Sequence, residues 1–170
     1  TRRSSDLVKL VHRNGSVKCH PDYPSTFWSC GNIDYYPNNT FMTIITNAKR
    51  EALLPSVENM KAKGCNGKEH FYVLDGVNRG SPELILGNLS RPLSLLKDQQ
   101  LQIWYGQDWI GCSEDNNSGT ACVDIFAWYV WDWQSGFTIR LKKSAVLCLI
   151  FLNCCFYRLI AFILCRLSEM

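Results

Sequence analysis

The residues best suited to chemistry lie in one polar loop, residues 108–124, which contains two cysteines. Carboxylate and amide oxygens are the ligands that Ca²⁺ prefers, and this loop supplies several of them. The candidates are Asp108, Glu114, Asp115, Asn116 and Asn117. Their spacing does not follow the twelve-residue EF-hand pattern, so a solvated loop closed by a disulfide is the alternative. Calcium is therefore the one cofactor that the sequence raises.

No catalytic constellation stands out elsewhere. The three histidines, His12, His20 and His70, are scattered along the chain. No serine lies in a G-x-S-x-G motif, and there is no glycine-rich phosphate loop. The spacing singles out no pair of carboxylates for glycoside hydrolysis. The sequence therefore leans away from an enzyme, and no catalytic residue is assigned.

Aromatic side chains form a second cluster, and their exposure decides what they do. Exposed, they would stack on sugars or form a hot spot for a protein partner; buried, they would fill a core. The cluster comprises Trp104, Tyr105, Trp109, Trp128, Trp131 and Trp133. Strand spacing favours burial of Trp104 and Trp128, whereas Trp109 follows Gly106 in a loop. Trp109 and Tyr105 are therefore the expected contacts for an extracellular protein or carbohydrate.

Nine cysteines indicate disulfides more than zinc. Four lie in a hydrophobic tail, and the other five are Cys19, Cys30, Cys65, Cys112 and Cys122. These five include no C-x-x-C pair and no histidine at zinc-ligand spacing, so an oxidising compartment is favoured. The expected bridges are Cys30–Cys65 and Cys112–Cys122. The second would close a loop of about ten residues and stabilise the fold by roughly 2–3 kcal/mol. Cys19 is left over.

Four N-x-S/T acceptors agree with a secreted protein. They begin at Asn14, Asn38, Asn88 and Asn116, and chance alone would give roughly two. All four lie in turn-like stretches that could carry a glycan. Cysteines and acceptors together predict an extracellular or cell-surface location. A glycan on Asn116 would argue against calcium in the same loop.

Length and charge narrow the number of domains and the classes of partner. The chain has 170 residues, enough for one ordinary domain, and a net charge of +3. Lysine and arginine form no block of five or more, so no nucleic-acid partner is expected. The chain starts at Thr1 and not at Met, so the true N-terminus is expected to be missing.

The expected fold is mainly β: an antiparallel sandwich or jelly roll with one short helix, over residues 27–134. Strand-like runs recur at intervals of about ten residues between turn residues. They span residues 27–36, 41–46, 71–74, 83–86, 101–105 and 121–130. The helix is expected over 56–63, because Ser56 can cap its start and Gly64 can end it. Residues 1–26 show little periodicity and are expected to form an extended connector.

The tail, residues 135–170, differs in character from the rest. Residues 144–165 are nearly all apolar and long enough to span a membrane. Arg158 would cost about 2.5–3.5 kcal/mol inside the bilayer. Lys142 and Lys143 would place the N-terminal side in the cytoplasm, contrary to the cysteine argument. The tail is therefore expected to be non-native read-through. The alternative is a transmembrane segment, which would make the chain a membrane-anchored, receptor-like fragment.

Three segments carry a resemblance to a known group of proteins. Residues 30–41 read CGNIDYYPNNTF, residues 101–108 read LQIWYGQD, and residues 114–124 read EDNNSGTACVD. Over residues 27–130 the chain resembles a module of secreted cnidarian extracellular proteins, including skeletal organic matrix proteins. The resemblance implies an extracellular module with no established activity, and the tail has no counterpart in it. The expected function is non-catalytic recognition or matrix interaction.

A second resemblance is shorter. Residues 100–106, QLQIWYG, are similar to the ELLVWYG strand of PR/SET methyltransferase-like domains. That family also needs an Asn-containing knot motif upstream, and residues 80–91 contain Asn88 but no such motif. A methyltransferase-like domain is therefore the less favoured alternative.

Overall fold

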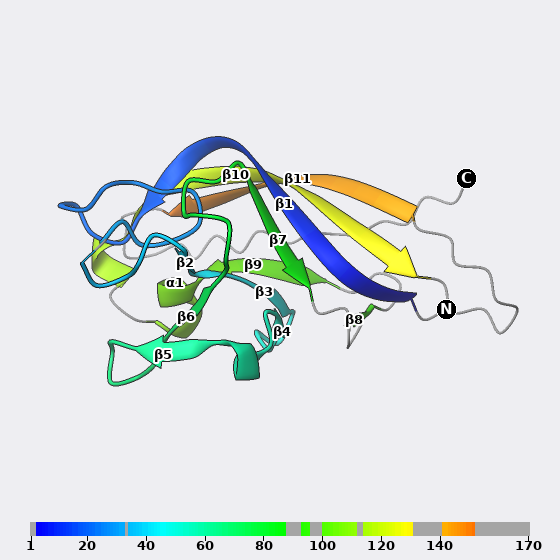
Figure 1. The fold of residues 1–170 in the computed structure, drawn as a ribbon, viewed down its shortest axis with the longest axis horizontal. Coiled ribbons are helices and arrows are strands. Elements are labelled where there is room, and N and C mark those ends of the chain that lie inside the picture. The colour runs from blue at the N-terminus through cyan, green and yellow to red at the C-terminus, as the bar shows by residue number, and fades with distance from the viewer. Residues whose placement is uncertain are drawn as a thin grey trace, which may run out of the picture.

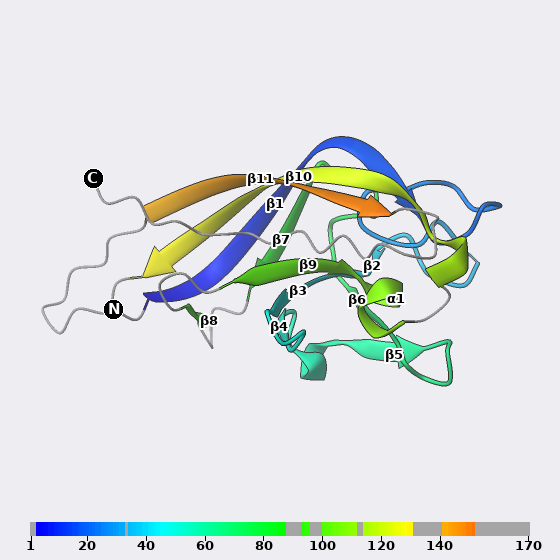
Figure 2. The same ribbon diagram turned by 180° about the vertical axis from the view of Figure 1, so that it is seen from behind.

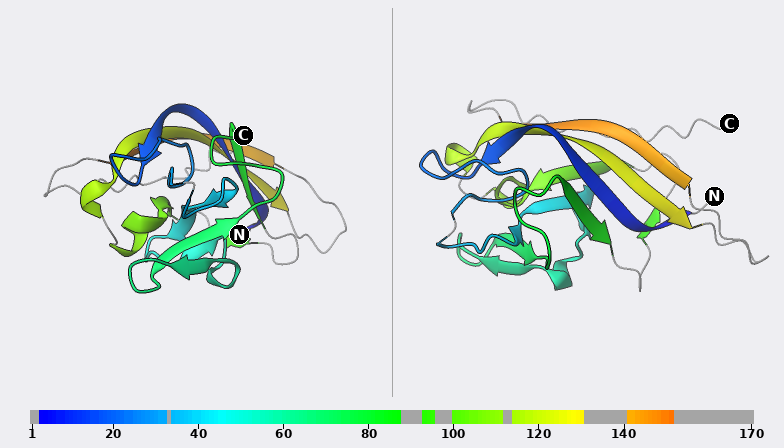
Figure 3. Two further views of the ribbon diagram at one scale, coloured as in Figure 1. Left: turned by 60° about the vertical axis from the view of Figure 1, so that its left-hand side comes forward. Right: turned by 45° about the horizontal axis from the view of Figure 1, so that its top comes forward.

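The computed structural model describes residues 3–32, 34–87, 93–95, 100–111, 114–130 and 141–151. The protein is mainly β, with 49% of residues in strands, three antiparallel sheets and, among the described residues, one short α-helix. This confirms the expected fold class and is consistent with a β-sandwich. In Figures 1 and 3 the largest sheet lies across the top, and the two smaller sheets lie below it.

The largest sheet contains five strands, with the long strand β1 (Arg3–Lys18) in its interior. Its order is β11 (Leu141–Phe151), β10 (Ser118–Val130), β1 and β7 (Glu83–Gly87). A further strand, β8 (Leu93–Leu95), pairs with the first residues of β1. All of these pairs are antiparallel. Figure 2 shows the long curved strands from behind.

The structure corrects the expectation of an extended connector over residues 1–26. Most of that segment is β1, which pairs with β10 on one side and with β7 on the other. Val8 and Leu10 on β1 are buried and belong to the main hydrophobic core. The first strand in the sequence is therefore part of the domain, because its apolar side chains help to form the core.

The smaller sheets have three strands each. One has the order β2-β6-β5 and the other β4-β3-β9. Their strands are β2 (Thr40–Phe41), β3 (Thr43–Asn47), β4 (Ala52–Leu54), β5 (Lys61–Lys63), β6 (Glu69–Val73) and β9 (Leu101–Tyr105). The strand expected over 41–46 is confirmed in outline by β2 and β3. Its expected hairpin partner over 27–36 is not a regular strand.

The helix lies elsewhere than the sequence predicts. Residues 56–63 form only a 3-10 turn, η1 (Val57–Asn59), followed by β5. The Ser56 side chain makes no capping hydrogen bond, and η1 buries no residue, so little holds a longer helix there. The α-helix is α1 (Gly106–Ile110), directly after β9, and Gly111 ends it in the left-handed conformation.

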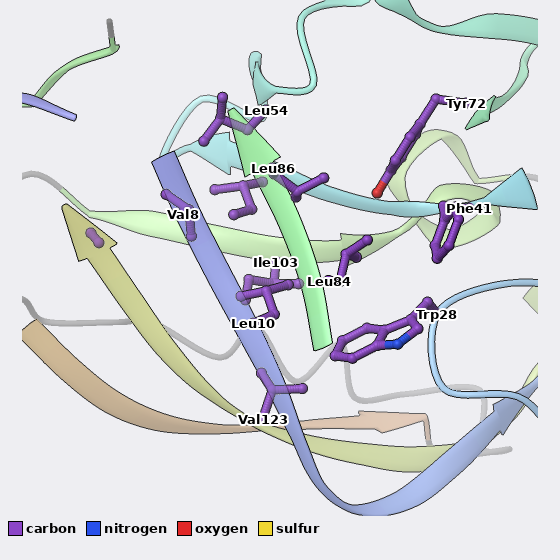
Figure 4. Close-up of a cluster of buried hydrophobic side chains, with 12 residues drawn as sticks. Val8, Leu10, Trp28, Phe41, Leu54, Tyr72, Leu84, Leu86, Ile103 and Val123 are labelled. Carbon is purple, nitrogen blue, oxygen red and sulfur yellow. The ribbon is translucent and has the colours of Figure 1, made fainter. Parts of the chain in front are cut away.

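The main core fills the space between the large sheet and the smaller ones (Figure 4). Its buried members are Val8, Leu10, Trp28, Phe41, Ile45, Leu54, Tyr72, Leu84, Leu86, Ile103, Val123 and Ala127. Trp28 is 1% exposed, and its indole nitrogen donates a hydrogen bond to the Ser81 carbonyl at 2.6 Å. The loop 27–36 therefore contributes a central core side chain without being a strand.

A second buried cluster contains a disulfide between Cys19 and Cys30. The expected pairing of Cys30 with Cys65 is therefore wrong, and Cys19 is not left over. The two cysteines are only 11 positions apart, and their Cα atoms lie 5.1 Å apart, so they meet without help from distant elements.

Two other described cysteines, Cys65 and Cys122, are also in disulfides. Cys112 lies outside the described residues, so the Cys112–Cys122 bridge stays a prediction. In the β10–β11 register, Cys122 lies opposite Cys148.

The hydrophobic tail is described only over β11. All of β11 pairs with β10, opposite residues 119–129. Residues 135–140 and 152–170, with Trp131 and Trp133, lie outside the described residues. In the part of the chain that the structure describes, no helix has the length and hydropathy needed to cross a bilayer. The membrane-anchored alternative stays an untested prediction.

Candidate functional site

The short helix α1 is the centre of the candidate site, because its position decides which side chains meet. Gly106 begins the helix beside the backbone of β6. A Cβ at this position would lie 2.7 Å from the His70 carbonyl oxygen and 3.3 Å from that of Met42. Glycine therefore allows the helix to approach the strand. This approach places Gln107 and Trp109 against neighbouring residues of β6.

Beside Trp109 of α1 lie a second tryptophan, an arginine and a histidine from neighbouring elements. We call Trp104, Trp109, Arg50 and His70 the Trp104–Trp109 surface; all four are half-buried. The Trp109 indole nitrogen donates a hydrogen bond to the Arg50 carbonyl at 2.9 Å. Its ring stands edge-on to His70, with centroids 5.1 Å apart. The Arg50 guanidinium lies 4.3 Å from the Trp104 ring centroid, so a cation–π contact links the two indoles through one arginine.

The structure places the two expected binding aromatics differently. Trp109 was expected to be exposed and is half-buried. Tyr105 is 3% exposed and belongs to the second buried cluster, so it does not present its ring to a ligand. Trp104, expected to be buried, is half-buried and contributes to the surface instead. The side chain of Trp128 lies outside the described part.

The expected calcium ligands are brought together only in part. The Asn117 amide donates a hydrogen bond to the Asp108 carboxylate at 3.0 Å. Oδ1 of Asn117 and Oδ1 of Asn116 are buried and have no hydrogen-bond partner. Asp115 is exposed, and the Glu114 side chain lies outside the described part. Among the described side chains, no three His, Cys, Asp or Glu residues are arranged to hold a metal.

A buried polar network lies on the other side of α1. Glu69 is 5% exposed, and its carboxylate accepts a hydrogen bond from the Gln107 amide at 2.7 Å. Burial, and then the Glu69 carboxylate, raise the pKa of Tyr36; the same two causes raise the pKa of Tyr105. The Tyr36 hydroxyl has no partner at normal hydrogen-bond length, so we take the effect of Glu69 on it as electrostatic. The hydrogen bond between Gln107 and Glu69 links α1 to β6 inside the protein.

Arg79 contacts the backbone on either side of the same region. Its guanidinium donates to the carbonyls of Cys30 and Tyr36. Burial lowers its pKa from the usual arginine value. Sequence reasoning missed Glu69, Gln107 and Arg79, because nothing in their spacing shows that they are buried together.

The four glycosylation acceptors differ in exposure. Asn14 and Asn38 are exposed, and Asn116 is half-buried with its side-chain oxygen enclosed. Asn88 lies outside the described residues. Attachment of glycans stays a prediction, and the exposed positions are the better acceptors.

Comparison with known proteins gives one informative match. No family model matches the chain, and no curated protein matches it. A sea anemone lectin shares its architecture. The solved structure of AJLec from Anthopleura japonica is similar to this chain with a TM-score of 0.64 and 28% sequence identity. The similarity covers 75% of this chain and 80% of AJLec. The expected cnidarian resemblance is thus supported in its coarser form, as similarity to one cnidarian protein.

Proposed function

We propose that this protein is an extracellular, non-catalytic module that binds carbohydrate. The observation that carries the proposal is the similarity to a sea anemone lectin over three quarters of the chain. The Cys19–Cys30 disulfide supports an oxidising compartment, in which extracellular glycans are the available partners. This function narrows the expected recognition or matrix-interaction role to one class of ligand.

The Trp104–Trp109 surface is the proposed contact. The apolar face of a sugar ring packs on an exposed part of an indole, and two half-buried tryptophans offer such faces. The Arg50 guanidinium donates hydrogen bonds to sugar hydroxyls without reorganisation, because its cation–π contact with Trp104 already orients it.

The experiment is a glycan array with the purified chain, followed by calorimetry with the best ligand. Trp109→Ala should weaken binding at least tenfold, since central aromatic contacts dominate such interfaces. Trp109→Phe keeps a ring and should retain part of the affinity. Tyr23→Ala is the matched control, because Tyr23 is another half-buried aromatic and its recorded contacts are with His20 and the second cluster.

One outcome would contradict the carbohydrate-binding function, and another would contradict the proposed site. The first is an array on which no glycan binds above background. The second is a Trp109→Ala variant that binds as tightly as Tyr23→Ala while both melt cooperatively. The second result would leave a carbohydrate-binding function and remove the site.

Calcium is the cofactor that we propose for the neighbouring loop. What supports the proposal is that Asn116 and Asn117 have buried amide oxygens without partners and that the Asp108 carboxylate lies beside Asn117, from whose amide it accepts a hydrogen bond. Calcium at 100 times its Kd would stabilise the fold by about 2.7 kcal/mol, a rise in Tm of roughly 5–11 °C. Thermal melts with calcium, magnesium or a chelator test this, and Asp108→Asn should abolish the rise. An identical Tm in all three conditions would contradict it.

A further inference from the structure

The edge strand β5 carries an exposed basic ridge on the β5–β6 hairpin. Lys61 and Lys63 are both exposed, and Lys68 is exposed in the turn that follows. We call these three residues the β5 lysine ridge. Lys61 and Lys63 are two positions apart on a strand, so both side chains leave the same face, about 7 Å apart.

No described carboxylate lies within ion-pair distance of the ridge lysines. The ion pairs in the described part of the chain involve Lys9, Arg13 and His20, and none of the ridge lysines. Glu69 lies directly opposite Lys63 in the strand register, but its carboxylate is buried and bonded to Gln107. The ridge therefore presents three positive charges to solvent.

One of these charges is held in place. The Lys63 ammonium lies 3.6 Å from the ring centroid of Tyr35, which is 39% exposed. The Tyr35 ring in turn stands edge-on to Tyr36 at 4.7 Å. A cation–π contact of this kind restricts the lysine side chain before a ligand arrives.

The ridge also lies beside a strand edge without a described partner. Among the described strands, β5 pairs with β6 alone. Lysines on such an edge discourage pairing with another chain. We propose that this ridge is a second carbohydrate-binding surface that takes sulfated polysaccharides.

The geometry favours a polymer with repeated anionic groups over other anions. Charges strung along a strand match a repeating ligand, whereas a single phosphate needs groups that converge on one point. Anionic membranes are recognised by clusters of about four to eight basic residues, more than this ridge supplies. The Cys19–Cys30 disulfide points to an oxidising compartment, where sulfated glycans rather than nucleic acids are met.

The test compares dextran sulfate with unsulfated dextran by calorimetry on the full chain. The wild type should bind only the sulfated polymer, and salt should weaken binding. The variant Lys61→Gln/Lys63→Gln/Lys68→Gln should bind at least tenfold more weakly. The matched control, Lys9→Gln/Lys18→Gln/Lys49→Gln, removes the same charge elsewhere and should change affinity less than threefold.

A Trp109→Ala variant separates this proposal from the first. It should keep full affinity for dextran sulfate, because the ridge does not include the Trp104–Trp109 surface. Equal losses in the two lysine variants would overturn the proposal, since binding would then follow net charge alone. Binding of phosphatidylserine vesicles but not of dextran sulfate would also overturn it, as would loss of dextran sulfate binding in Trp109→Ala.

Discussion

Three buried tyrosines should make this protein unfold in alkali in a predictable way. Burial raises the pKa of Tyr36, Tyr72 and Tyr105 well above the usual value, because the phenolate is poorly solvated inside the protein. The nearby Glu69 carboxylate adds to this effect at Tyr36 and Tyr105. All three hydroxyls therefore stay protonated in the folded protein at a pH where they would ionise in the unfolded chain.

The sign and size of the effect follow from proton linkage. An unfolded tyrosine has a pKa of about 10. The stability that each buried tyrosine contributes is therefore fully present below about pH 10, and it is lost as the pH rises toward the pKa of that tyrosine in the folded protein. Each group lowers the free energy of unfolding by about 1.4 kcal/mol per pH unit in that range, and three groups by about 4 kcal/mol. With an ordinary stability of about 5–15 kcal/mol, the protein should unfold between about pH 11 and pH 14.

Tyr36→Phe isolates one of the three groups. The Tyr36 hydroxyl has no hydrogen-bond partner, so its removal should cost less than about 1 kcal/mol at neutral pH. Above about pH 10 the free energy of unfolding of the variant should fall by only about 2.7 kcal/mol per pH unit, because two buried tyrosines remain. Urea unfolding at a series of pH values, with tyrosinate absorbance as a second probe, measures this slope. Tyr35→Phe removes the neighbouring exposed hydroxyl and serves as the control. Equal slopes in the wild type and Tyr36→Phe would refute the reasoning.

Three further predictions concern the fold. Gly15 has φ +77°, and a Cβ there would lie 1.9 Å from a carbonyl oxygen of β10; Gly15→Ala should therefore destabilise by roughly 2–4 kcal/mol in urea unfolding. Gly67 has φ +78° and open space around it, so Gly67→Ala should destabilise by only about 1 kcal/mol. Equal losses of stability in Gly15→Ala and Gly67→Ala would contradict this reasoning. Non-reducing peptide maps should show Cys19 linked to Cys30, and a Cys30 peptide joined elsewhere would disprove the pairing; losing the bridge should cost about 2–4 kcal/mol. Trp28→Phe removes the donor to the half-buried Ser81 carbonyl and should lower stability by about 1–3 kcal/mol, measured as a fall in Tm. An unchanged Tm would argue against a central role for this indole.

The parts of the fold that follow simple alternation could be predicted from the sequence. β7, with its alternating exposed and buried residues, matches the strand expected over 83–86. β1 was missed because a bulge between His12 and Asn14 changes which positions face inward. Before the bulge Leu10 is buried, and after it Val17. A periodicity search sees two short, conflicting patterns there and not one long strand.

The sequence could predict which segment contains the candidate site, but not which of its side chains are exposed. The segment around Trp109 stood out by composition, and the structure places this tryptophan half-buried there. Whether Tyr105 or Trp104 faces solvent depends on α1 and on the turn that holds Arg50, which are brought together by tertiary packing. The β5 lysine ridge was hidden because residues 56–63 resemble a helix. Without a working cap or a buried face, that segment becomes an exposed turn and an edge strand.

The position of β1 has a consequence for how the chain folds as it leaves the ribosome. β1 is made before the other described strands, yet its partners in the sheet come from residues 83–87, 93–95 and 118–130. Both of its edges and its apolar face therefore wait until most of the domain has been translated, and such long-range pairing makes folding slow. The Cys19–Cys30 loop spans only 11 positions and can close much earlier. A chaperone or partner that binds the emerging chain would therefore meet an unpaired β1 beside an oxidised loop.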